Sequence, residues 1–183
     1  LFRSGKVKRD EIFVVSKLWN TFHHPDHVKI AVKKTLEDLG LQYLDLYLIH
    51  FPIALKYVPI DNLYPPEWVN FDSEVPGMVF AEGVTYQMTY QALESLVEEG
   101  LVKNIGVCNV GTSMLRQVLS YCKIKPAVLQ VEMHPYLTQE KLLRYANEQG
   151  IQVMAFSNLG APSYIEIGSA KQDDSFLDQL VIK

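Results

Sequence analysis

Several features that would assign a chain to a specialised class are missing from these 183 residues. No apolar run approaches the roughly 20 residues that a membrane-spanning helix needs, and residues 1–8 do not form a signal peptide. Lysine and arginine number 17 against 21 aspartates and glutamates, so no basic excess is available for nucleic acid. We therefore expect a globular cytoplasmic protein without a membrane or nucleic-acid partner.

Cysteine is also scarce. Cys108 and Cys122 are the two cysteines, and they do not have the spacing of a zinc site. Both lie in segments with apolar periodicity, which favours buried thiols in a reducing compartment over a disulfide. Residues 23–27 contain three histidines, but no strand or helix register fixes them, and Asp26 is better explained as the start of a helix. We expect no metal site.

Short β-rich runs alternate with amphipathic helical segments along the chain. The predicted strands are residues 12–16, 44–49, 104–108, 128–132 and 152–156. Apolar residues recur with the helical period in four segments between them. These run from Pro25 to a stop at Gly40, from Tyr86 to Gly100, from a Thr112 cap onward, and from a Thr138 cap to Gly150.

This alternation predicts an α/β fold with a parallel sheet, either a doubly wound open sheet or a closed (β/α)8 TIM barrel. An open dinucleotide-binding sheet would usually carry G-x-G-x-x-G after its first strand, and this sequence has none, so the barrel is favoured. A barrel has eight strands in typically about 250 residues. We expect residues 1–183 to form a single, incomplete barrel domain of about five strands that lacks its first strands and its last strand. Residues 51–84 are too long for an ordinary connection and are predicted as a lid loop.

Polar residues stand at the carboxyl ends of the predicted strands, where barrel enzymes carry their active sites. Lys17, His50, Asn109 and Ser157 follow strands, and Gln130 lies near the end of its own. Their ammonium, imidazole, amide and hydroxyl groups could hold a planar amide ligand and polarise a carbonyl. Simpler interpretations exist for two of them, because Lys17 can extend to solvent and His50 can pack against a backbone partner.

Six segments in the same order resemble motifs of the aldo-keto reductases and together span nearly the whole chain. They are residues 15–20, 44–52, 105–109, 125–132, 134–137 and 155–160. Within that family, residues 50–54, 64–66 and 163–166 are most similar to the xylose and aldose reductases.

The resemblance implies reduction of aldehyde or ketone carbonyls, including aldose sugars such as xylose, by hydride transfer from NADPH or NADH. Lys17 matches the lysine that lowers the pKa of an active-site tyrosine, because a nearby cation stabilises phenolate. His50 matches the histidine that orients the substrate carbonyl. Trp19 and Phe51 match residues that line the substrate pocket.

Further matches concern the nicotinamide end of the cofactor. Asn109 and Gln130 match the side chains that hold its carboxamide, and Phe156 takes the place of the aromatic residue on which the ring stacks. Cys108 replaces a serine that is common beside the asparagine. A thiol is a weaker hydrogen-bond donor than a hydroxyl, so we expect slightly looser nicotinamide binding.

The remaining matches concern the rest of the cofactor. Ser157 and Leu159 match a loop over the pyrophosphate, and Glu166 matches a carboxylate that reaches the adenosine ribose. The strand with the catalytic tyrosine and its aspartate, and the last strand with residues for the 2′-phosphate, have no counterpart here. We expect these 183 residues alone to be inactive.

Two rival functions are weighed against the reductase. Residues 106–113 approach the P-loop pattern G-x-x-x-x-G-K-[ST], but Thr112 stands at the lysine position, which argues against nucleotide hydrolysis. A catalytically inactive barrel that binds a cofactor or serves a structural role is the second rival. It would have no use for both Lys17 and His50, so we favour an enzyme, active as a monomer or homodimer.

Overall fold

In the computed structural model, the described residues are 5–62, 64, 77–160, 165 and 168. Within them, five parallel strands form one sheet in chain order: β1 (Val15–Leu18), β2 (Leu44–Ile49), β3 (Val102–Cys108), β4 (Val128–Glu132) and β5 (Gln152–Phe156). The α helices are α1 (Pro25–Leu39), α2 (Tyr86–Glu98), α3 (Thr112–Tyr121) and α4 (Glu140–Glu148). Short 3-10 turns are η2 (Arg9–Glu11) and η3 (Asn20–Phe22). The predicted α/β class is confirmed.

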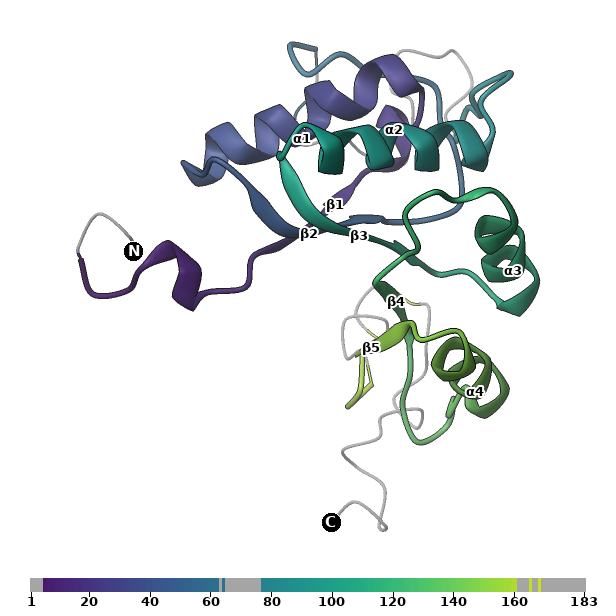
Figure 1. Cartoon of the computed structure of the whole chain (residues 1–183). Helices are drawn as coiled ribbons and strands as arrows, with labels where there is room; N and C mark the ends of the chain where they lie inside the picture. The colour runs from purple at the N-terminus through teal and green to yellow at the C-terminus, as the bar shows by residue number, and fades with distance from the viewer. Residues whose placement is uncertain (1–4, 63, 65–76, 161–164, 166–167, 169–183) are drawn as a thin grey trace.

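The sheet is curved, and the helices cover one of its faces (Figure 1). Tyr47 and Ile49 belong to the larger core beneath the helices, whereas Leu46 and Leu48 belong to a smaller cluster on the other face. This alternation follows from the two-residue period of a strand, and it makes β2 buried on both sides. None of the described helices has the length and apolar character needed to cross a membrane.

Strand β1 begins later than predicted. The sequence pattern placed it at residues 12–16, but it runs from Val15 to Leu18. Side chains bind part of the backbone before it, because the amide of Val14 donates to the Asp45 carboxylate at 2.9 Å and Arg9 donates to the carbonyl of Ile12 at 2.8 Å. The carbonyl of Val14 still accepts from the backbone amides of Asp45 and Leu46. Strand β3 begins two residues before its predicted start, at Val102.

Helix α1 follows its sequence signals, since Pro25 lies in its first turn and Gly40 ends it with a left-handed φ of 64°. Two predicted caps are wrong. Thr112 is the first residue of α3, after an extended Gly111. Helix α4 begins after Gln139 rather than Thr138, because Gln139 adopts a left-handed φ of 54° that delays the helical turn.

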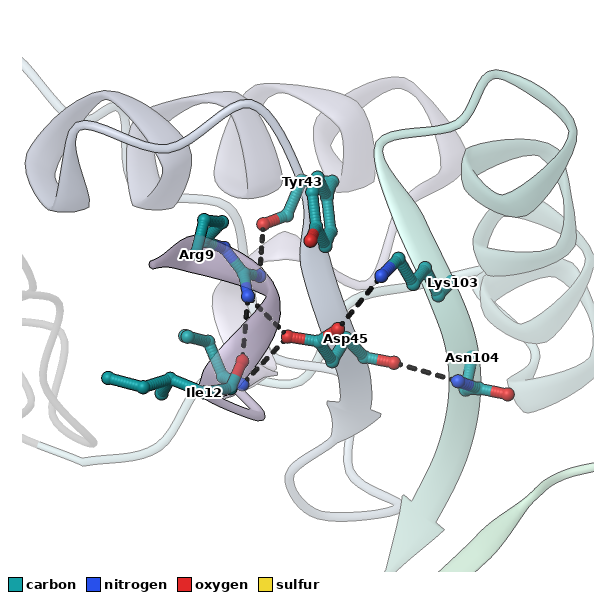
Figure 2. Close-up of polar contacts among 7 residues, drawn as sticks. Arg9, Ile12, Tyr43, Asp45, Lys103 and Asn104 are labelled. Atoms are coloured by element: carbon teal, nitrogen blue, oxygen red, sulfur yellow. Dashed lines mark hydrogen bonds and ion pairs between the residues drawn. The ribbon is translucent and has the colours of Figure 1, made fainter. Parts of the chain in front are cut away.

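A buried carboxylate joins three segments at the amino ends of the strands (Figure 2). Asp45 on β2 contacts Arg9 at 2.7 Å and Lys103 on β3 at 3.3 Å. Both cations also lie over the ring of Tyr43, 4.0 and 4.1 Å from its centroid. Burial raises the pKa of Asp45, but the hydrogen bond from Val14 and the two cations outweigh it and leave the pKa below its ordinary value.

The described parts of residues 51–84 contact each other and the first turn of α1. Leu55 and Phe80 form an antiparallel bridge between the two ends of this segment. The ring of Tyr57 stacks on His27, with centroids 3.5 Å apart. These contacts fix the amino-terminal part of the segment beside α1.

Candidate functional site

Lys17 and His50 lie on neighbouring strands near their carboxyl ends. Lys17 pairs with Leu48, and the backbone N–H of His50 donates to the carbonyl of Leu18 at 3.1 Å. Lys17 is two residues from Val15, which packs on the face of the sheet away from the helices, so both share that inner face. Because β1 starts late, Lys17 is the third residue of the strand rather than the residue just beyond it.

Aromatic side chains surround the imidazole. His50 stacks on Phe51 with ring centroids 4.5 Å apart and meets Trp19 edge-on at 5.2 Å. Trp19 and Phe51 also contact each other edge-on, at 6.4 Å. The two residues predicted to line the substrate pocket therefore flank His50, and they restrict the orientation of its ring.

The positive charge of Lys17 acts on two other groups of the site. Burial and then the Lys17 charge lower the pKa of His50 below its ordinary 6.5. Burial raises the pKa of the Cys108 thiol to about 12, and the Lys17 charge opposes that rise. The lowered pKa leaves the His50 imidazole neutral at neutral pH.

The predicted carboxamide ligands follow β3 and lie within β4. Asn109 has a left-handed φ of 57°, and its side-chain Nδ2 donates to the carbonyl of His50 at 2.8 Å. Its backbone N–H donates to the carbonyl of Gln130 at 2.9 Å. The Gln130 amide contacts sulfur atoms in the described part of the chain, namely Met154 Sδ at 2.8 Å and Cys108 Sγ at 4.0 Å.

The predicted ring-stacking and pyrophosphate residues follow on β5 and its loop. Phe156 is the last residue of β5 and is half-buried, and Ser157 next to it has a left-handed φ of 52°. The carbonyl of Ser157 accepts from Gly160 at 2.9 Å, which closes a tight turn with Leu159 67% exposed on it. Glu166, the predicted ribose ligand, lies outside the described residues.

Two contributors to this region were not predicted from the sequence. A Cβ added at Gly106 would lie 2.4 Å from the carbonyl oxygen of Val128 and 2.6 Å from a methyl of Leu48. A glycine inside an apolar strand is a signal for such a close approach. Met154, the partner of the Gln130 amide, carries no such signal, because apolar strand residues commonly serve only as core.

The chain thus has parallel strands, helices on one face and a polar cluster at the carboxyl strand ends, which is the arrangement of an α/β-barrel enzyme. A family model described as the aldo/keto reductase family matches residues 1–174. The chain belongs to the aldo/keto reductase family.

Individual relatives agree with this assignment. The chain is 52% identical over 182 residues to an NADPH-dependent aldose reductase of Saccharomyces cerevisiae. The match covers 98% of this chain and 56% of the relative. The chain is 49% identical over 172 residues to an NADPH-dependent D-xylose reductase of Candida boidinii, covering 94% and 53%. The chain spans about half the length of these curated relatives.

A solved structure gives the same result for the fold. Aldose reductase from Giardia lamblia matches with a TM-score of 0.75 and 38% sequence identity, over 86% of this chain and 49% of that one. The five-stranded sheet is therefore part of a (β/α)8 barrel, as predicted.

Proposed function

We propose that the full-length protein containing this chain reduces aldehyde and ketone carbonyls, including aldose sugars such as xylose, to alcohols. The relatives that bear the names aldose reductase and xylose reductase support this proposal. The observation that carries it is that Lys17, His50 and Asn109 stand near the carboxyl ends of β1, β2 and β3, with Asn109 Nδ2 2.8 Å from the carbonyl oxygen of His50. We also propose a cytoplasmic location and a single barrel domain, with residues 51–84 as a lid over the mouth of the barrel.

The cofactor would be NADPH, or NADH in its place. The side-chain amides of Gln130 and Asn109 suit the carboxamide of its nicotinamide end. Gln130 has two sulfur atoms as side-chain partners, which are weak hydrogen-bonding groups, so a carboxamide would improve its contacts. Asn109 stands beside it with a second amide. Phe156 would flank the ring, Ser157 and Leu159 would follow the pyrophosphate, and Glu166 would reach the ribose.

The hydride would come from NADPH when it is bound. The residues of this chain orient the acceptor and control a proton. The neutral imidazole of His50 can donate a hydrogen bond to the carbonyl oxygen of the substrate, between the rings of Trp19 and Phe51. Lys17 would stabilise the phenolate form of a tyrosine supplied by the rest of the protein, so that this tyrosine more readily donates its proton to the former carbonyl oxygen and completes the alcohol.

Activity of the full-length protein tests this proposal. Purified protein is mixed with NADPH and either xylose or glyceraldehyde, and the absorbance of the reduced cofactor is followed. We expect aldehyde-dependent loss of absorbance with formation of the matching alcohol. Binding of NADPH without turnover on any aldehyde would instead support the inactive-barrel alternative.

A further inference from the structure

One hydrogen bond connects a predicted cofactor ligand to the predicted substrate-orienting residue. Asn109 donates from its side-chain Nδ2 to the backbone carbonyl of His50 at 2.8 Å. The same residue donates its backbone N–H to Gln130 at 2.9 Å. Asn109 therefore contacts the end of β2 with its side chain and the end of β4 with its backbone.

The hydrogen bond from Asn109 fixes the backbone carbonyl of His50, which the sheet leaves unbound. The N–H of His50 is fixed by Leu18 of β1 at 3.1 Å. Strand β2 ends at Ile49, so the β2–β3 ladder does not extend to the carbonyl of His50. The side chain of Asn109 binds that carbonyl, so the backbone of His50 is fixed relative to both β1 and β3.

The chemistry of an amide allows two simultaneous tasks. A side-chain amide has two N–H donors and one carbonyl acceptor, and the bond to His50 uses one donor. The other donor and the oxygen can meet a carboxamide. Asparagine also tolerates the left-handed backbone at this position better than most residues. Glycine would tolerate the left-handed backbone, but it has no side-chain N–H donor. Aspartate would keep the shape of the side chain, but its carboxylate cannot donate.

We infer that Asn109 is a positioning residue that couples the nicotinamide site to His50 through this backbone hydrogen bond. The inference rests on the proposed function, because it assigns a role within the same site. Its consequence is that loss of the Asn109 side chain displaces the imidazole even when no cofactor is bound.

The decisive measurement uses full-length protein without cofactor. Asn109→Gly keeps the left-handed backbone and removes the amide, and the titration of the His50 ring is followed by NMR, with its signal assigned from a His50→Gln variant. We expect the His50 midpoint to move up towards its ordinary value, because a released imidazole is less buried and lies farther from Lys17.

The chain offers a matched control. Gln139 also has a left-handed backbone, and its side-chain amide donates to the carbonyl of Glu132 at 3.2 Å. Gln139→Gly therefore removes the same kind of contact elsewhere, and it should leave the His50 titration unchanged. An unchanged His50 titration in Asn109→Gly would overturn the inference and leave Asn109 as a cofactor ligand alone.

Kinetics provide a second measurement that does not depend on the glycine variant. Asn109→Asp keeps the side-chain shape and an acceptor for the carboxamide, but it cannot donate to His50. We expect kcat/KM for the aldehyde to fall on the order of 100-fold, as small misplacements of reacting groups do, with a smaller change in the dissociation constant of NADPH. Equal losses in both constants would contradict a positioning role. If wild-type protein reduces no aldehyde, the proposed function fails, whereas the titration still tests the placement of His50.

Discussion

The charge of Lys17 acts from the inner face of β1 on two side chains of neighbouring strands, His50 and Cys108. Replacing it with methionine keeps the length of the stem and removes the charge. If the full-length protein has the proposed activity, we expect Lys17→Met to lower kcat on the order of 100-fold, the range of a positioned acid–base group, with a smaller effect on KM. The same change should raise the pKa of His50, because a nearby cation no longer disfavours the imidazolium.

Steady-state kinetics with NADPH and glyceraldehyde check this prediction. Lys33→Met is the matched control, because Lys33 is exposed on α1 and should tolerate the change. If Lys17→Met turns over at the wild-type rate, Lys17 has no part in proton donation.

A site residue could be predicted where it directly follows a strand, because its place in the chain then puts it at the carboxyl end of the sheet. His50, Asn109 and Ser157 directly follow predicted strands, and they follow β2, β3 and β5 in the structure. Their partners could not be predicted. The bond from Asn109 to His50 spans 59 residues, and the contact of Gln130 with Met154 depends on the register of β4 and β5. Such contacts depend on how distant strands align.

At the scale of elements, a buried side chain on α2 holds the connection that enters β4. Glu94 is 3% exposed, and its Oε1 accepts from the amides of Lys123 at 2.6 Å and Ile124 at 2.8 Å. One turn earlier, the hydroxyl of Tyr90 donates to the carbonyl of Ile124 at 2.9 Å. Helix α2 thus fixes three backbone groups of the loop between α3 and β4.

Removing this carboxylate should destabilise the fold. Glu94→Ala leaves two amides without an acceptor, and we expect a loss of about 3 kcal/mol in the free energy of unfolding. Glu94→Gln keeps one acceptor and should cost about 1 kcal/mol. Denaturant unfolding of the full-length protein measures both. Glu98→Ala on the same helix is exposed and should change stability by less than about 0.5 kcal/mol; a similar loss in both alanine variants would contradict the role of Glu94.

Element boundaries show where sequence patterns are sufficient. Helix α1 could be predicted because Pro25, Gly40 and the apolar period between them are local signals. The first residues of β1 and α4 could not be predicted from such local signals. Residues 12–14 have the composition of a strand, yet side chains of Arg9 and Asp45 bind the Ile12 carbonyl and the Val14 amide. The left-handed Gln139 has no local signature.

At the scale of the whole molecule, one histidine should make stability depend on pH. His23 is 1% exposed before α1, and its carbonyl accepts from Thr89 of α2 at 2.8 Å. Burial lowers its pKa from 6.5 to about 4. Between these values the unfolded chain binds a proton that the folded chain does not. The free energy of unfolding should therefore fall as the pH drops from 6.5 to 4, by up to about 3 kcal/mol.

Unfolding of wild type and His23→Gln across this range separates the contribution of His23 from other groups. We expect the variant to lose less stability on acidification. His24→Asn replaces a more exposed imidazole on the same loop, and asparagine can still cap α1, so it should follow the wild type. Parallel curves for wild type and His23→Gln would show that His23 does not titrate in this way. Asp45 acts separately, because its stabilising ion pairs are lost only at pH below its ordinary 3.8.

The close strand contact at Gly106 leaves no room for a side chain on β3 at this position. Gly106 is two residues below Cys108 on the inner face, where main chain and the methyl of Leu48 already fill the space that a Cβ would need. A side chain at this position would force β3 away from β4. These two strands position Asn109 and Gln130, which are joined by the backbone hydrogen bond of 2.9 Å. The missing side chain of Gly106 thus keeps the two amide-bearing residues in register.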